Sequence, residues 1–200
     1  MIGAVTQTGT EQADAVRARV ERAALELFTL RGFDAVTADE VADAAGISRR
    51  TFFRHHPTKA DAVWGDFDRH VARLDRLLRE TDPGRPVLET VCGAYADVND
   101  YGPDDLPVLR QRMRLILTEP ALQAHSQLRY AAIDRVVAEH VARRTGDAPT
   151  ALLPRLVAAG TRAAAMTAFA VWLADDRSSL AGHLHRAFDE LAGGFPSLRS

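Results

Sequence analysis

The chain has very little cysteine and lysine. Cys92 is the only cysteine among 200 residues, which excludes an intrachain disulfide and leaves no cysteine cluster for a metal. Lys59 is the only lysine, so arginine carries almost all of the positive charge. We found no signal-peptide pattern and no apolar run long enough to span a bilayer, so we expect a cytoplasmic protein without a metal or a cofactor.

The remaining composition is that of a soluble globular protein, with 46% apolar and 26% charged residues. No strand pattern appears, and glycine and proline cluster between segments with helical periodicity. We therefore predict an all-α fold of about nine helices. Residues 1–11 lack apolar periodicity and are predicted to form a flexible tail, followed by a small domain over 12–58 and a helical body over 59–200.

Positive charge is concentrated in one short stretch, although the net charge is −2. Between Ser48 and Lys59 there are three arginines, one lysine and two histidines, and no acidic residue. The segment just before it carries Asp39, Glu40 and Asp43 instead. The sign of the charge changes between the two segments, which predicts a cationic face suited to nucleic acid.

These two segments read as two short helices in succession. Thr37 and Glu40 have the spacing of a capping box, and Ser48 can cap a second helix. Gly46 lies between them, where a tight turn needs a permissive backbone. We predict helices over 38–45 and 49–55, which together form a helix-turn-helix whose second helix can enter a DNA major groove.

A longer helix is predicted to follow directly. Pro57 ends the second short helix, and Thr58 can cap the next one. Its apolar stripe runs from Val63 to Leu78, and the whole helix is expected to be about twenty residues or roughly 30 Å long. Such a helix would begin beside the small N-terminal domain and end in the helical body, so a movement of the body could be transmitted to the helix-turn-helix. The body continues beyond Pro86.

The run from Val41 to Asp61 resembles the N-terminal signature of TetR-family transcriptional regulators. Residues 24–28 and 31–33 complete the match, and residues 64–68 and 112–125 resemble the branch associated with mycofactocin gene clusters. The resemblance implies bases and phosphates as partners, because arginine can grip guanine and a helix N-terminus favours phosphate. The DNA-binding positions that it implies are Thr37, Ser48, Arg49, Arg50, Thr51, Phe53, Arg54, His55 and Lys59.

Two residues depart from the family pattern. Phe53 stands where tyrosine is common, so a hydroxyl contact to phosphate is lost. His56 stands where a buried Phe or Val is usual, which places a polar group in the packing of the head.

The resemblance also implies a homodimer joined by the last two long helices of each subunit. Two reading helices would then lie about 34–36 Å apart, one DNA turn, on a palindromic operator. An apolar stripe on the last helix permits this interface but is equally typical of intramolecular core. The predicted interface residues are Ala163, Leu180, Leu184, Phe188 and Leu191.

The body is expected to hold an inducer pocket, although each candidate wall residue also suits an ordinary core. Its predicted residues are Trp64, Phe67, Arg112, Met113, Leu117, Tyr130, Met166, Phe169 and Trp172. Arg110, Arg112, Arg114 and Arg129 flank this region. Because the mycofactocin branch is associated with such ligands, we hypothesise an acyl-CoA with its phosphates at these arginines, whereas a solvated arginine face is the alternative.

Two other classes of function compete with a ligand-released repressor. An enzyme is disfavoured, because His183 and His185 diverge on a helix and no metalloprotease motif, nucleophile elbow or phosphate loop is present. A helical protein-interaction or small-molecule-binding module without operator function is the remaining alternative. The cationic segment counts against that alternative.

Overall fold

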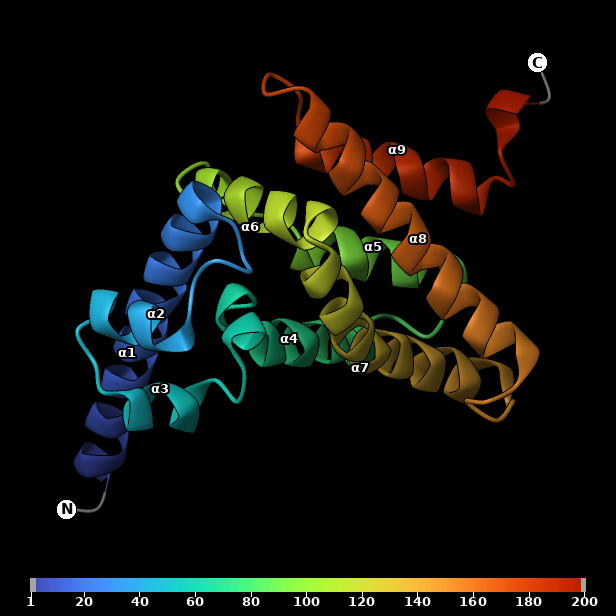
Figure 1. Cartoon of the computed structure of the whole chain (residues 1–200). Coiled ribbons are helices and arrows are strands. Elements are labelled where there is room, and N and C mark those ends of the chain that lie inside the picture. The colour runs from blue at the N-terminus through green and yellow to red at the C-terminus, as the bar shows by residue number, and fades with distance from the viewer. Residues whose placement is uncertain (1–2, 199–200) are drawn as a thin grey trace. The chain divides into compact units, whose positions relative to one another are not determined.

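The computed structural model describes residues 3–198, and the side chains of residues 12–198. Within these residues it contains nine α-helices, two short 3-10 helices and no strand, which confirms the predicted all-α fold (Figure 1). The elements are α1 (Gly3–Arg31), α2 (Ala38–Ala44), α3 (Arg49–His55), η1 (Lys59–Val63), α4 (Phe67–Glu80), α5 (Val87–Val98), α6 (Leu106–Thr118), α7 (Pro120–Thr145), α8 (Leu152–Ala174), α9 (Leu180–Ala192) and η2 (Pro196–Leu198).

The helices form two compact units. Unit 1 comprises Met1–Phe67 and Val108–His125, and unit 2 comprises Asp68–Pro107 and Ser126–Ser200. The first break between the two units falls after Phe67, and most of α6 belongs to unit 1, while the boundary between a DNA-binding domain and a body after residue 58 stays a prediction. The first helix also begins at Gly3, so the backbone of residues 3–11 continues α1 where the sequence pattern indicated a tail.

The core of unit 1 is apolar and aromatic. Val20 and Phe28 of α1 are buried, and so are Val41 of α2 and Phe52 of α3. The rings of Phe28 and Phe33 lie edge to face with centroids 5.0 Å apart. Burial of each large side chain contributes about 1.5–3 kcal/mol, so this cluster holds α2 and α3 on α1.

The predicted long fourth helix is interrupted. Residues 59–63 form the 3-10 helix η1, and α4 begins only at Phe67. Gly65 in the break has φ +56°, and a Cβ atom there would lie 2.5 Å from the Glu21 Oε2 atom. Only glycine fits this left-handed conformation and this close approach without strain. The prediction of one continuous helix from residue 59 was wrong, because a tertiary contact with α1 overrides the local periodicity.

Unit 2 is built from α4, α5, α8, α9 and most of α7. The helices α8 and α9 pack along each other and against α5. Leu74 of α4, Val137 of α7, Trp172 of α8 and Leu184 of α9 are fully buried in this unit. Alanines such as Ala158 and Ala165 keep α8 thin where it is buried, which permits close packing of the helices.

By length and composition α8 could cross a membrane, whereas the sequence reading found no such run. Length and composition do not distinguish a membrane span from a core helix. One face of α8 is buried within unit 2, from Pro154 to Trp172, and Arg162 on this helix pairs with Asp134 of α7. Because 33% of its most apolar 18-residue stretch is buried, packing within unit 2 accounts for only part of the apolar character of α8.

Candidate nucleic-acid interface

The N-terminus of α2 carries the predicted capping box. The Thr37 hydroxyl accepts from the Glu40 amide at 3.2 Å, and the Thr37 amide donates to Glu40 Oε2 at 2.8 Å. Arg31 pairs with the same carboxylate at 2.8 Å. The hydrogen bonds from the Thr37 backbone and from Arg31 lower the pKa of Glu40 to about 2. The Thr37 hydroxyl also donates to Glu40 at 2.9 Å, so its proton is already engaged within the unit.

The turn and the start of α3 also follow the predicted pattern. Gly46 has φ +66°, and the Ile47 amide donates to the Ala42 carbonyl at 3.0 Å, which closes the turn. The Ser48 hydroxyl caps α3 by accepting from the Thr51 amide at 3.1 Å. These local bonds fix the direction in which α3 leaves the turn.

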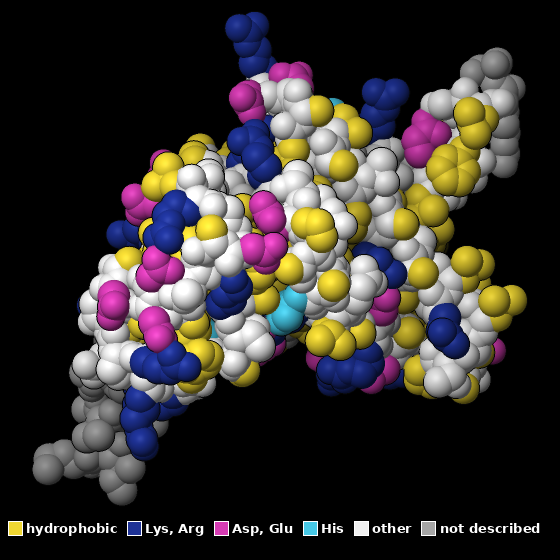
Figure 2. Space-filling model, viewed as in Figure 1, with side chains coloured by type: hydrophobic (Ala, Val, Ile, Leu, Met, Phe, Trp, Pro, Cys, Tyr) yellow, Lys and Arg dark blue, Asp and Glu magenta, His cyan; other side chains and the backbone are white. Residues whose placement is uncertain are grey.

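The two faces of α3 differ sharply. Phe52 is fully buried, whereas Phe53 is 39% exposed on the outer face. Arg49, Arg50 and Arg54 are exposed, and dark blue Lys and Arg side chains lie over α3 in the space-filling view (Figure 2). The predicted recognition helix α3 therefore has an exposed cationic face, and the buried Phe52 packs its other face against unit 1.

The arginines of α3 are held differently from one another. Arg49 forms an ion pair with Asp39 of α2, and its guanidinium lies 5.2 Å from the centre of the Phe53 ring. Arg54 contacts the ring of His55 at 3.3 Å. Arg50 has no hydrogen bond or ion pair to another residue that the structure describes. Exposed ion pairs contribute about 0–1 kcal/mol, so Asp39 mainly orients Arg49, a role that the sequence analysis missed despite the opposite charges.

The ammonium group of Lys59 forms hydrogen bonds within unit 1. Its Nζ atom donates to the carbonyl oxygens of Phe33 at 2.7 Å and Val36 at 2.9 Å. The ammonium also lies 4.2 Å from the centre of the Phe33 ring. Two of its three donors therefore tie η1 to the loop between α1 and α2. A phosphate contact by Lys59 stays a prediction, and the observed geometry gives the residue a structural role first.

Replacing Lys59 by methionine is expected to destabilise the protein by about 1–3 kcal/mol. The change keeps the aliphatic stem but leaves two partly buried carbonyls without their charged donor. Urea denaturation followed by circular dichroism measures the loss. Unchanged stability combined with weaker DNA binding would instead identify Lys59 as a phosphate contact.

His56 is a buried polar residue within unit 1. Its side chain is 3% exposed, its ring lies 5.4 Å from that of Phe52, and its Nε2 atom has no hydrogen-bond partner among the described residues. Burial, and next the charge of His55, lower the pKa of His56, while Asp61 opposes the shift. Because the folded pKa is the lower one, stability is lost as the pH falls below the unfolded value of about 6.5.

The side chain of Asp61 joins η1 to the second turn of α7. Its Oδ2 atom accepts from the Thr58 amide at 2.8 Å, and His125 Nε2 lies 3.1 Å from Oδ1. The Trp64 ring packs edge to face on Phe67 with centroids 5.1 Å apart and lies 6.4 Å from the His125 ring. Two of the predicted pocket residues, Trp64 and Phe67, thus contribute to the packing of unit 1.

The other predicted pocket residues are divided between the units. Met113 and Leu117 lie on α6 in unit 1, whereas unit 2 contains Tyr130, Met166, Phe169 and Trp172. Of these, only Leu117 and Met166 are half-buried instead of buried. The rings of Phe169 and Trp172 are 6.4 Å apart within unit 2.

Two of the four arginines predicted to meet an anionic ligand, Arg112 and Arg129, form ion pairs within the chain. Arg112 pairs with Glu21 of α1, and its side chain is only 20% exposed. Burial lowers the pKa of Arg112 to about 10. Arg129 lies 3.5 Å from Asp68. The Arg112 guanidinium is thus paired inside unit 1, and a contact of Arg112 with a ligand phosphate stays a prediction.

Three of the five predicted dimer residues are not on the surface. Leu180, Leu184 and Phe188 are at most 4% exposed, and the Phe188 ring packs on Tyr95 of α5 with centroids 5.8 Å apart. Their stripe belongs to the core of unit 2, so their prediction as interface residues was wrong.

The faces of α8 and α9 that point away from the core of unit 2 form a groove on the surface. Ala163 and Leu191 line a groove of about 690 Å³ there, together with residues from both helices and from the C-terminal segment. Phe195 and Leu198 of that segment are 52% and 83% exposed, and yellow hydrophobic side chains mark this end of the chain (Figure 2). The exposed lining residues include Val171, Arg186 and Phe195.

The geometry agrees with comparisons to known proteins. Residues 22–62 match the family model of bacterial regulatory proteins of the tetR family, and residues 85–196 match that of the MftR C-terminal domain. The chain is 39% identical over 175 residues to the putative mycofactocin biosynthesis transcriptional regulator MftR of Mycobacterium tuberculosis, covering 88% of each chain.

Two further relatives extend the comparison. The HTH-type transcriptional activator FasR of Mycolicibacterium smegmatis is 29% identical over 174 residues, covering 82% of this chain and 75% of FasR. The crystal structure of Thermus thermophilus FadR, a repressor in complex with lauroyl-CoA, has a TM-score of 0.59 at 24% identity, covering 89% and 94% of the two chains. The chain belongs to the TetR family of transcriptional regulators, in the branch with the MftR C-terminal domain.

Proposed function

We propose that the protein is a dimeric transcriptional repressor that a small amphipathic ligand releases from a palindromic operator. The observation that carries the proposal is α3, a capped helix with a buried Phe52 and an outer face of exposed arginines. Family membership makes DNA binding the general function. Repression is the more specific part, since one relative is named as an activator.

Arg50 is the first candidate for reading a base. It is exposed and has no partner in the described part of the chain, so its guanidinium can turn towards a guanine without breaking an ion pair. Arg49 is already oriented by Asp39 and Phe53. The remaining predicted contacts of α3 and its flanks, Ser48, Thr51, Arg54 and His55, would then position the helix on the phosphate backbone.

Replacing Arg50 by alanine is expected to weaken binding to the specific site by about 1–3 kcal/mol, or about fivefold to over a hundredfold. Fluorescence anisotropy with the DNA upstream of the gene, and with a scrambled duplex of equal length, measures the difference at several salt concentrations. The loss should be much smaller on the scrambled duplex.

A matched control uses Arg76→Ala, which removes the same charge from an exposed position on α4 in unit 2. Its binding should match the wild type. Equal losses for Arg50→Ala on both duplexes would make Arg50 a phosphate contact. Wild-type protein that binds neither duplex in a salt-dependent manner would favour a protein-interaction module without operator function.

The groove between α8 and α9 supports the dimer. A second copy would cover the exposed apolar side chains of Val171, Phe195 and Leu198, while Arg186 and Glu190 offer charges of opposite sign for a two-fold contact. Ala163 and Leu191 line this groove and are the predicted interface residues that the proposal retains. Cytoplasmic localisation fits a regulator that acts on DNA.

The ligand proposal is an acyl-CoA-type molecule, supported by the lauroyl-CoA in the complex of FadR from Thermus thermophilus. The predicted residues of unit 2 that would contact an acyl chain are Tyr130, Met166, Phe169 and Trp172. They are apolar or aromatic, and adaptable side chains of this kind suit a hydrocarbon chain. Arg112 has no part in this proposal, since its charge is compensated by Glu21.

A further inference from the structure

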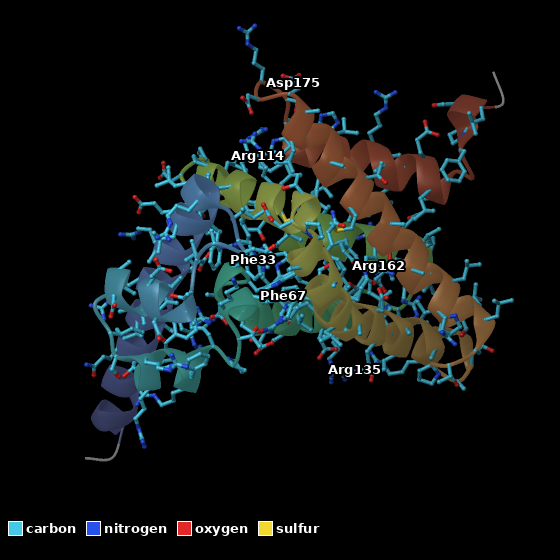
Figure 3. All side chains as sticks on the ribbon, in the orientation of Figure 1. Phe33, Phe67, Arg114, Arg135, Arg162 and Asp175 are labelled. Atoms are coloured by element: carbon cyan, nitrogen blue, oxygen red, sulfur yellow. The ribbon has the colours of Figure 1, made fainter. Side chains whose placement is uncertain are left out.

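A partly buried polar cluster lies within unit 2, among largely apolar helices. It consists of Tyr95 from α5, Tyr130 and Asp134 from α7, and Arg162 from α8. Arg162 extends from α8 towards α7 (Figure 3), and its Nε atom donates to both oxygens of Asp134, at 2.8 and 3.1 Å. The same guanidinium lies 5.7 Å from the centre of the Tyr130 ring. Three helices therefore meet through polar side chains.

A buried hydroxyl without a hydrogen-bond partner in this cluster belongs to Tyr95. The side chain is 3% exposed, and its Oη atom has no hydrogen-bond partner among the residues that the structure describes. A buried hydroxyl without a partner costs about 1–3 kcal/mol. Nearly all buried polar groups in proteins are paired, so this one needs an explanation. A hydrogen-bond acceptor from outside the chain supplies one.

The charges around Tyr95 restrict what that acceptor can be. Arg162 and Asp134 neutralise each other, so neither is left to compensate an incoming ion. A carboxylate would be desolvated near Asp134, and an ammonium near Arg162. Burial, reinforced by Asp134, raises the pKa of Tyr95, and burial raises that of Tyr130 to about 12. The phenols thus stay protonated, and Tyr95 can act as a donor.

We propose that Tyr95 binds an uncharged carbonyl oxygen of the ligand, such as that of a thioester, an ester or a ketone. The inference rests on the proposed ligand-responsive function and specifies which chemical group the ligand presents to unit 2. Asp134 and Arg162 fix the surroundings of the hydroxyl, and Phe188 supports the Tyr95 ring from its apolar side. A free carboxylate of the same chain length is discriminated against.

The first test uses the protein without ligand, refolded from denaturant to remove bound molecules. Tyr95→Phe deletes only the unpartnered hydroxyl, so the melting temperature is expected to stay the same or to rise. Tyr101→Phe is the matched control, because Tyr101 is a half-buried tyrosine outside the cluster. A clear fall in the melting temperature for Tyr95→Phe alone would show that the hydroxyl has a structural partner and would overturn the proposal.

The second test measures binding of four probes by thermal shift and calorimetry: lauroyl-CoA, 2-undecanone, undecanoate and undecylamine. The wild type should bind lauroyl-CoA and the ketone better than the two charged C11 probes. Tyr95→Phe should bind the carbonyl probes about tenfold more weakly, the equivalent of losing one hydrogen bond. Tyr101→Phe should bind them as the wild type does.

Three outcomes would overturn the proposal: equal affinities in Tyr95→Phe and the wild type, preference for undecanoate over the ketone, or no binding of any probe. DNA binding distinguishes this failure from failure of the proposed function. Ligand-free Tyr95→Phe should bind DNA as the wild type does. Salt-dependent operator binding without binding of carbonyl probes would therefore reject the Tyr95 site but not the proposed function as a DNA-binding regulator.

Discussion

Replacing Glu21 by glutamine is expected to destabilise the protein by about 3 kcal/mol, the lower end of the range for breaking a buried ion pair. Glu21 of α1 pairs with Arg112 of α6 inside unit 1, where the side chains are only 16% and 20% exposed. Burial already lowers the pKa of Arg112 to about 10, which shows how unfavourable an uncompensated cation is there. Urea denaturation of the full chain measures the change.

The size of this effect depends on burial, so an exposed pair provides the control. Asp14→Asn breaks the pair between Asp14 and Arg17, whose side chains are 36% and 43% exposed, and should cost less than about 1 kcal/mol. The double variant Glu21→Gln, Arg112→Met should recover much of the loss, because it leaves no buried charge. A cost for Glu21→Gln no larger than that for Asp14→Asn would show that the pair is not enclosed in solution.

The second large effect is expected at Gly65. Alanine in the left-handed conformation costs about 1–2 kcal/mol, and its Cβ atom would collide with the Glu21 carboxylate, which Arg112 holds in place. We expect a total loss of about 2–4 kcal/mol, because the collision adds to the backbone strain. Gly93→Ala is the control: nothing lies within 4 Å of its new Cβ, and alanine favours the interior of α5 by about 0.5–1 kcal/mol.

A double-variant cycle separates the two contributions at Gly65. In a Glu21→Ala background the collision disappears, so Gly65→Ala should cost only the backbone strain. Thermal melts and urea denaturation of the four proteins give the coupling energy. An identical cost in both backgrounds would mean that the Glu21 carboxylate moves aside freely.

Capping and turn rules for short stretches of sequence predicted the helix-turn-helix segment correctly. The capping box of Thr37 and Glu40, the Ser48 cap and the turn at Gly46 are all present as expected. Each depends on residues at most five apart in the sequence, so a short stretch contains all the information that is needed. The resemblance to the TetR family and to its mycofactocin branch is likewise confirmed by matched domains over most of the chain.

Contacts between distant residues explain what the sequence analysis missed. Lys59 meets carbonyls 23 and 26 residues away, and Gly65 meets Glu21 of α1. A stripe such as Leu184 and Phe188 shows that one helix face is buried, but its periodicity is the same whether another helix of the chain or a second copy covers it. The Arg112 pairing could not be inferred for the same reason, because Glu21 is an ordinary charge on a predicted helix.

The enclosure of Lys59 has a consequence for control of the protein by modification. Lys59 is the only lysine, and its ammonium is bound to two carbonyls, so acetylation has no lysine to neutralise on the outer face of α3. The exposed cations of that face are guanidinium groups, which remain charged throughout the physiological pH range. The cationic charge that α3 presents is therefore nearly independent of acetyl transfer and of cellular pH.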